Sequence, residues 1–240
     1  MLKTLNSIPH ISIIITSYNY ESFICDAVDS CFVSGQNLKK EIIVIDDGST
    51  DKTLDKLKKY KDKIKVIEKK NEGLEKAVNL GITNSNGLYW VRLDADDYFT
   101  DNYFEIVSEY LHLDYSFYYG DHFLVDKNKN YLKTIVMPDC DVQTIRSMGD
   151  FLPGAVMYKK DIVNIIGLYN EKFKNSGYEN YDYILRIIEK NYKGLKINKP
   201  LLNYRMHNNN MSKNRNVNNR FIDHLVDRFN LDKNIFYKKF

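Results

Sequence analysis

The stretch RLDADDYF, residues 92–99, places three carboxylates within four positions, directly after the apolar run LYWV. Three like charges this close repel one another, which favours a cation among them. Asp94 and Asp96 can converge on one hard cation, and carboxylate oxygens suit Mg²⁺ or Mn²⁺, whose coordination shells are often completed by substrate phosphates. Two other interpretations are that these are solvated turn residues, or that Asp97 or Thr100 caps a following helix. A helix cap would explain one of the three acidic residues but not all of them.

A second acidic turn, Asp46-Asp47-Gly48-Ser49, follows the apolar run EIIVID. A carboxylate here can accept hydrogen bonds from a base N–H or a ribose hydroxyl, and a helix that starts next presents free backbone N–H groups. A turn with a helix cap, for which Ser49 and Thr50 are candidates, explains the same residues. The sequence contains neither GxGxxG nor GxxxxGK[ST], which excludes the dinucleotide fingerprint and the P-loop.

The first half of the chain alternates strand-like and helix-like segments. Strands are predicted from short β-branched runs and helices from a 3.6-residue apolar period. The predicted strands are 11–16, 41–46, 64–68 and 87–94, and the predicted helices are 20–33, 49–60, 73–85 and 101–111. This order implies right-handed βαβ units and a mostly parallel sheet with helices on both faces. Ligands of such sheets bind beyond the carboxyl ends of the strands, which selects the loops TSYN, DDGSTD and DADD.

The alternation weakens after residue 116. YSFYYGDHFLVD and YLKTIVM are predicted to form a hairpin or part of a mixed sheet. VNIIGLYNEKF, YENYDYILRIIEKN and the tail from Asn214 are predicted to contain further helix. The tail mixes basic residues with Phe, Leu and Ile, so it could pack on the domain, form an oligomer contact or lie at a membrane interface.

The composition excludes several classes of protein. Hydrophobic residues make up 43% of the 240-residue chain, and 35 basic against 32 acidic residues are too balanced to indicate nucleic-acid binding. No stretch approaches the roughly 18 apolar residues that a membrane span needs, and the N-terminus lacks a signal-peptide core. Cys25, Cys31 and Cys140 show no CxxC spacing, which is typical of a reducing compartment. We therefore expect a cytoplasmic protein.

Seven segments occur in an order that resembles the family 2 glycosyltransferases of GT-A-type fold. They are ISIIITSYN, EIIVIDDGSTDKT, NEGLEKAVNLGI, GLYWVRLDADDYF, PGAVMYKKDIVNIIGLYNEKF, ENYDYILRI and YRMHNNNMS, and they span about residues 11–212. The resemblance implies an α/β fold with a Rossmann-like N-terminal half and a smaller mixed acceptor-side region. It implies a domain at 1–213, divided into a nucleotide-sugar half (1–115) and an acceptor half (116–213), followed by a helical tail at 214–240.

The resemblance also implies a role for individual residues. The donor would be a uridine-linked nucleoside diphosphate sugar, bound together with Mn²⁺ or Mg²⁺. Pro153, Gly154 and Ala155 match a loop on the acceptor side, and Asp97 is a lesser candidate beside the metal. The residues that match the nucleotide-sugar site are Thr16, Tyr18, Asp46, Asp47, Asn71, Asp94 and Arg205, and those that match the metal site are Asp94, Asp96 and His207.

The chain departs from the family pattern at two positions. Val78 stands where the family usually has Arg or Lys near the nucleoside base. Asn180 stands at the position of the family's general base, and an amide cannot accept a proton at neutral pH. Glu179 and Asp182 are the candidates to replace it, because at i and i+3 they share one face if the segment is helical.

We expect a metal-dependent, inverting glycosyltransferase that acts on a glycan or lipid-linked glycan, as in bacterial surface polysaccharide or glycolipid synthesis. We expect it in the cytoplasm or peripherally bound at the inner face of the cytoplasmic membrane. One alternative is a catalytically impaired nucleotide-sugar or glycan-binding protein of the same fold. A nucleotidyltransferase is less favoured, since it needs a glycine- and lysine-rich loop after the first strand, and TSYNYESF contains neither residue.

Overall fold

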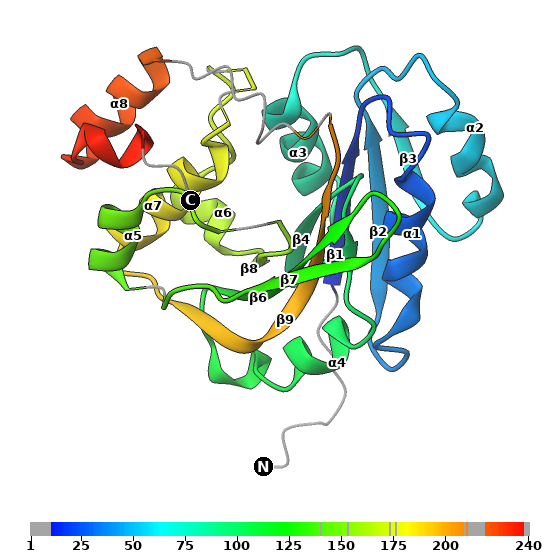
Figure 1. Ribbon diagram of the computed structural model, residues 1–240, viewed down its shortest axis with the longest axis horizontal. Helices are drawn as coiled ribbons and strands as arrows, with labels where there is room; N and C mark the ends of the chain where they lie inside the picture. Colours follow the sequence, from blue (N-terminus) through cyan, green and yellow to red (C-terminus); the bar gives the residue numbers. More distant parts are fainter. Residues whose placement is uncertain are drawn as a thin grey trace.

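The computed structural model describes residues 11–139, 141–152, 154–172, 174–175, 177–208, 210 and 219–237. Within these ranges the strands form one sheet in the order β3-β2-β1-β4-β8-β6-β9-β5, with β7 paired to β6 (Figure 1). The strands are β1 (Ile11–Ser17), β2 (Lys40–Asp46), β3 (Lys65–Glu68), β4 (Tyr89–Asp94), β5 (Tyr98–Phe99), β6 (Phe117–Asp126), β7 (Tyr131–Ile135), β8 (Met157–Lys159) and β9 (Gly194–Met206).

The predicted helices are shorter than the sequence patterns that predict them, and the helix at Val142–Met148 was not predicted. They are α1 (Ile24–Val33), α2 (Thr53–Leu57), α3 (Leu74–Thr83), α4 (Tyr103–Ser108), α5 (Val142–Met148), α6 (Ile162–Ile166), α7 (Glu179–Glu189) and α8 (Asn219–Phe229). Three short 3₁₀ segments are η1 (Lys58–Tyr60), η2 (Leu111–Leu113) and η3 (Lys233–Tyr237).

Strands β3, β2, β1 and β4 are parallel neighbours, as predicted, so their carboxyl ends meet at one edge of the sheet. Thr16 is the register partner of Asp94, and Ser17 is the register partner of Asp46. The predicted hairpin is also confirmed, because β6 and β7 pair antiparallel. The sheet thus brings the three polar loops together.

Helices cover both faces of the sheet, as predicted for this fold (Figure 1). Alternation along the strands sends Ile13 and Ile15 into a core with α1 and α4, and Ile14 into a core with α3 and α7. On β4, Trp90 lies in the α7-side core while Val91 lies in the opposite core. Arg92 and Asp94 follow Trp90 at two-residue steps, so they face α7.

The described part of the C-terminal tail packs on the domain. Phe221, Ile222, Leu225 and Phe229 of α8 are buried in the same core as α7. This burial agrees with the packing interpretation of the tail. The expected domain boundary at residues 213 and 214 falls within 211–218, outside the described residues. Within the ranges that the structure covers, no helix is both long and apolar enough to cross a bilayer.

The predicted cap of the second helix is wrong. Helix α2 begins at Thr53, and Ser49 and Thr50 instead contact the loop after β1. The Asn19 backbone N–H donates to Ser49 Oγ at 2.9 Å, and the Thr50 backbone N–H donates to Asn19 Oδ1 at 2.7 Å. These side chains therefore hold two of the three polar loops against each other.

Candidate active site

The Asp46-Asp47 turn is held by backbone N–H groups. Asp46 Oδ1 accepts hydrogen bonds from the N–H of Gly48 at 3.2 Å and of Ser49 at 2.8 Å. Asp47 accepts from Glu72 N at 3.0 Å and Gly73 N at 2.9 Å, and it pairs with Lys69 Nζ. The Asp47 carboxylate thus orders the approach to α3.

One oxygen of this turn remains available. Within the described part of the chain, Asp46 Oδ2 and the Ser17 hydroxyl are buried and have no hydrogen-bond partner. Buried polar atoms are normally satisfied, so an unpartnered pair on adjacent strand ends suits a ligand that donates hydrogen bonds. A nucleoside base or a ribose carries such donors.

The other residues predicted for the nucleotide-sugar pocket surround this turn. Thr16 is buried at the end of β1, while the Tyr18 side chain, on the loop that follows, is 45% exposed. Asn71 is exposed and lies against the turn, since a Cβ built on Gly48 would be 3.0 Å from the Asn71 nitrogen. Lys174 Nζ lies 3.3 Å from Asn71 Oδ1, which brings the segment before α7 to the same edge.

The second acidic turn is closed by a hydrogen bond from Asp97 N to Asp94 O, at 3.1 Å. Asp96 and Asp97 are both buried, so the interpretation as solvated turn residues is wrong. The helix-cap interpretation is wrong as well. Asp97 Oδ1 accepts from Arg205 N at 2.8 Å and Thr100 Oγ1 donates to Pro200 O at 3.2 Å, while α4 starts at Tyr103.

Electrostatic repulsion distinguishes this turn from the first. Burial raises the pKa of Asp94 against the lowering influence of Arg92, and the charge of Asp96 raises it further. Burial, followed by the charges of Asp96 and Asp94, raises the pKa of Asp97 well above its usual value. A cation placed among these side chains would reverse both shifts.

Asp96 and His207 lie side by side. His207 Nε2 is 2.9 Å from Asp96 Oδ2, and Asn210 supports the pair, because its Oδ1 accepts from His207 N at 2.6 Å. The Tyr20 hydroxyl hydrogen bonds to Asp96, and burial raises the pKa of this phenol, which keeps it a donor. Tyr20 and Asn210 were not predicted, although each stands within three residues of a predicted one.

The donor set fits a divalent cation in part. Asp96 and His207 supply an oxygen and an imidazole nitrogen in contact, and phosphate oxygens and water can complete such a shell. Asp94 is less available, because Arg92 lies 3.1 Å from each of its two oxygens. Among the described residues, no three His, Cys, Asp or Glu side chains converge as a ready metal site.

Arg205 on β9 supports the backbone of the second acidic turn. Its Nε donates to Asp96 O at 2.9 Å, its Nη2 pairs with Asp26 Oδ2 at 2.8 Å, and its Nη1 donates to Lys127 O at 3.3 Å. The side chain is 2% exposed, so these donors do not face an open cleft. The structure thus shows Arg205 as a support of the turn, with its donors engaged by protein acceptors, whereas the resemblance implied a place in the nucleotide-sugar site.

Arg92 links the acidic turn to α7. Its Nη2 donates to Asp94 Oδ2 and its Nη1 donates to Glu179 Oε1, both at 3.1 Å. Burial lowers the pKa of Arg92, but the Asp94 and Glu179 carboxylates outweigh this effect and raise it above its usual value. Arg92 was not predicted as a site residue, although a two-residue step along a strand places it on the same face as Asp94.

The two candidate bases on α7 have different surroundings. Glu179 reaches the site through Arg92, and its Oε2 is buried without a hydrogen-bond partner in the described ranges. Asp182 is also buried, and its Oδ2 accepts from Arg186 Nε at 2.9 Å. Arg186 in turn donates to Ile166 O at 2.6 Å, which directs this ion pair toward α6. The shared helix face therefore does not bring both carboxylates to the acidic turn.

Asn180 lines a small cavity beside Arg92. The cavity, of about 10 Å³, has room for about one water molecule, and its wall includes Tyr169 and Gly154. A Cβ built on Gly154 would lie 3.6 Å from Asp94 Oδ2, so the predicted acceptor-side loop does approach the acidic turn. Pro153 of that loop lies outside the described residues.

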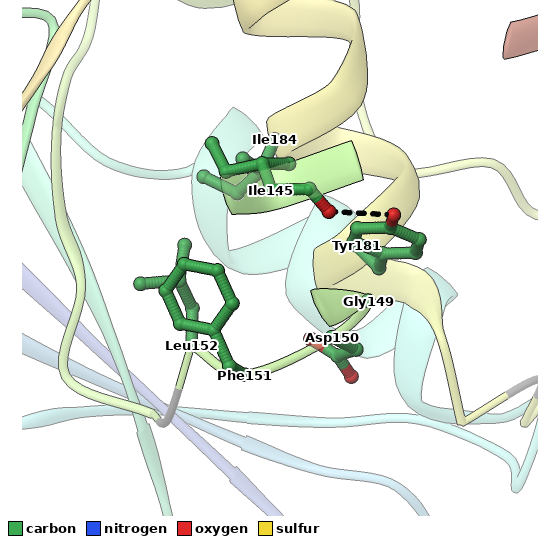
Figure 2. Close-up of a pocket in the computed structure, with 7 residues that line it drawn as sticks. All are labelled: Ile145, Gly149, Asp150, Phe151, Leu152, Tyr181 and Ile184. Atoms are coloured by element: carbon green, nitrogen blue, oxygen red, sulfur yellow. Dashed lines mark hydrogen bonds between the residues drawn. The ribbon is translucent and has the colours of Figure 1, made fainter. Parts of the chain in front are cut away.

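A second depression has a different character. It lies between α5 and α7 and is lined largely by apolar side chains, with the Tyr181 hydroxyl donating to Ile145 O at 2.8 Å (Figure 2). It has no room for a water molecule. We therefore place the candidate active site at the acidic edge of the sheet.

Two residues of the segment AVN, residues 77–79 on α3, have structural contacts. Val78 is buried in the core, so it does not replace the basic side chain usual at that position. Asn79 Nδ2 donates to Tyr169 O at 3.0 Å, and Asn79 Oδ1 accepts from Tyr169 N at 2.8 Å. This helix therefore fixes the segment that carries Tyr169.

Comparison with solved structures identifies the same fold. The crystal structure of S. aureus TarS 1-349 in complex with UDP-GlcNAc superimposes with a TM-score of 0.74 at 19% identity, covering 93% of this chain and 67% of that one. A second crystal structure, of S. aureus TarS 1-349, gives a TM-score of 0.67 at 20% identity, covering 82% of this chain and 60% of that one. These likenesses confirm the predicted GT-A-type architecture.

Sequence comparison identifies the family. An uncharacterized glycosyltransferase of Haemophilus influenzae is 31% identical over 178 residues, covering 72% of this chain and 52% of that protein. One of Rickettsia typhi is 33% identical over 179 residues, covering 69% and 55%. The chain thus spans about half the length of these curated relatives. The model of glycosyl transferase family 2 matches residues 12–164, and the chain belongs to that family.

Proposed function

We propose that the chain transfers a sugar from a UDP-sugar to an acceptor hydroxyl with inversion at the anomeric carbon. The observation that carries the proposal is the position of Arg92, which holds Asp94 of the acidic turn and Glu179 of α7 at 3.1 Å each. One guanidinium thereby links a donor-side carboxylate to a candidate base, and the same guanidinium lines the small cavity at Asn180. The family relationship supports transfer, and the complex of TarS with UDP-GlcNAc supports a uridine-linked donor.

The donor would lie across the carboxyl ends of β1, β2 and β4. Asp46 Oδ2 and the Ser17 hydroxyl would accept hydrogen bonds from the base or ribose, with Thr16, Tyr18 and Asn71 around them. Asp47 would act indirectly, by ordering the turn before α3.

The diphosphate would lie beside Asp96 and His207, the two side chains that could hold Mn²⁺ or Mg²⁺. A bound divalent cation neutralises the charge that develops on a diphosphate leaving group. Tyr20 and Asn210 would keep Asp96 and His207 in place, and Arg205 would keep the backbone of the acidic turn in place.

We assign Glu179 as the base. Its Oε1 is fixed by Arg92. The unpartnered Oε2 would accept the proton of the acceptor hydroxyl while the acceptor oxygen attacks the anomeric carbon. Asp182 would instead stabilise α7 through Arg186. The acceptor would be a glycan or lipid-linked glycan of the bacterial cell envelope, an assignment that rests on family analogy.

The test is release of free nucleoside diphosphate from a panel of donors, with and without Mn²⁺, in the presence of acceptor glycans. Glu179→Gln should lower turnover by about 10²–10⁴-fold and leave donor affinity nearly unchanged, because a positioned base contributes about that factor. Glu189→Gln, at the exposed far end of the same helix, is the matched control. Turnover of Glu179→Gln equal to that of the control would exclude Glu179 as the base.

A second candidate function is binding without transfer. It is favoured by Asn180 at the usual position of the base and by the engagement of Glu179 Oε1 with Arg92. If the wild-type protein binds UDP in the presence of Mn²⁺ but releases no product with any donor and acceptor, this binding function replaces the proposed one.

A further inference from the structure

One of the two polar atoms of the Asn180 side chain has a hydrogen-bond partner. Tyr169 Oη donates a hydrogen bond to Asn180 Oδ1 at 2.9 Å. Burial raises the pKa of Tyr169 above its usual value, so the phenol stays protonated and remains a donor. Asn180 is half-buried at the wall of the small cavity, and the structure shows no acceptor for its Nδ2 within the described ranges.

Tyr169 is itself fixed from two helices. Its backbone N–H and carbonyl both bond to the Asn79 side chain of α3, at 2.8 and 3.0 Å. Its ring stacks on Tyr183 of α7, with ring centroids 4.7 Å apart. The hydroxyl therefore has little freedom to move, and the Asn180 amide cannot rotate without losing this hydrogen bond.

We infer that Tyr169 is a positioning residue that holds the Asn180 amide with its carbonyl oxygen occupied and its NH₂ group free to donate to a substrate oxygen. This inference rests on the proposed function. The substrate would be a hydroxyl-bearing sugar at the cavity lined by Arg92 and Gly154. Asn180 would orient the acceptor oxygen by donating to a lone pair, while the proton of the same hydroxyl passes to Glu179. The residue that cannot act as a base would thus retain a role in binding.

The first test measures the side chain at position 180 without any substrate. Asn180→Asp is made in the wild-type and in the Tyr169→Phe backgrounds, and the introduced carboxyl is titrated by ¹³C NMR. A hydroxyl that donates to a carboxylate favours its charged form, so the pKa should be about one unit lower when Tyr169 is present. Arg92 borders the same cavity in both backgrounds and does not change between them.

Tyr181→Phe provides the matched control. It removes a hydroxyl from the same helix, but that hydroxyl donates to Ile145 O at the depression between α5 and α7 (Figure 2). It should leave the pKa of the introduced carboxyl unchanged. Tyr169→Phe keeps the ring that stacks on Tyr183, and equal melting temperatures would show that both backgrounds are folded.

The second test measures transfer. Tyr169→Phe should raise KM for the acceptor by about 2–10-fold, the value of one hydrogen bond, with a smaller change in kcat and no change in UDP affinity. Equal carboxyl pKa values in the two backgrounds, or a wild-type acceptor KM in Tyr169→Phe, would overturn the inference. A pKa difference without transfer to any acceptor would support the positioning by Tyr169 and refute the proposed reaction, so the two failures are distinguishable.

Discussion

The two acidic turns look alike in sequence, since each follows a buried parallel strand, yet their surroundings are opposite. In the first, Asp46 and Asp47 accept from four backbone N–H groups and Lys69. In the second, burial and like charges raise the pKa of Asp94 and Asp97, with Arg92 as the opposing cation beside Asp94. The first turn is stabilised by its carboxylates, and the second is destabilised by them unless a cation binds. This difference supports the proposal that the second turn, and not the first, holds the metal and the diphosphate.

Removing a carboxylate from the second turn should have the largest effect. Asp96→Asn should weaken UDP binding in Mn²⁺ about 100-fold, or about 3 kcal/mol, because one ligand and its charge are lost. Calorimetric titrations with Mn²⁺ and with a chelator measure this effect, and Asp62→Asn on an exposed turn is the control. If wild-type protein binds UDP equally well in Mn²⁺ and in chelator, the metal role of this turn is wrong.

Removing the charge of Asp47 from the first turn should lower the stability of the fold. In Asp47→Asn the amide NH₂ would face a backbone N–H of Glu72 or Gly73, so the free energy of unfolding should fall by about 2–3 kcal/mol. Urea denaturation measures the change. An Asp47→Asn variant as stable as wild type would show that the turn does not depend on the charge of Asp47.

The stability of the fold should also depend on pH through His122 on β6. Burial lowers the pKa of His122 to about 4, against the opposing charge of Asp121. The unfolded chain therefore binds a proton between about pH 6.5 and 4 that the folded chain does not. The free energy of unfolding should fall by about 2 kcal/mol from pH 7 to pH 5 as a result.

His122→Gln should remove this part of the pH dependence and leave the contribution of the aspartates visible. His112→Gln, at an exposed histidine, should retain it. An unchanged pH profile of stability in His122→Gln would contradict the assignment.

The smallest expected effect is an increase in the free energy of unfolding. Asp97→Asn keeps the acceptor for Arg205 N and removes a buried negative charge, so in chelator the free energy of unfolding should rise by about 1 kcal/mol. Urea denaturation in chelator and in Mn²⁺ measures it. If Asp97→Asn is less stable than wild type in chelator, charge repulsion does not dominate the second turn. The two turns would then not differ in how their carboxylates affect stability.

Much of the sheet could be predicted from the sequence, because buried β-branched runs and turn residues are local signals. Strand β9 was not predicted. It contains Pro200, which is unusual inside a strand and here pairs with Asp121 where the register of β6 and β9 shifts. Helix α6 lies in a segment that was predicted to contain helix, but it ends at Ile166, early in that segment, because Gly167 takes a φ of +81° that ends the helix.

The sequence predicts that the three polar loops meet at one edge of the sheet, but it does not predict most of their contacts. The structure confirms this common edge, because the carboxyl-end rule depends on strand order alone. The contact of Arg92 with Glu179 joins residues 87 positions apart, and no spacing pattern encodes it. The partners of Asp47 are largely backbone N–H groups, which have no signature in a sequence. Whether an aspartate orders a turn or binds a cation is decided by such partners.

The connections of Arg205 have a consequence for biosynthesis. Arg205 lies on β9 and contacts Asp97, 108 positions earlier, and Asp26, 179 positions earlier. A nascent chain that ends before β9 can already pair the four parallel strands, yet its acidic turn would lack this support. Contacts of such long sequence separation form late and slowly, because chain entropy opposes them. The ability to bind a donor should therefore appear only when nearly all of the domain has left the ribosome.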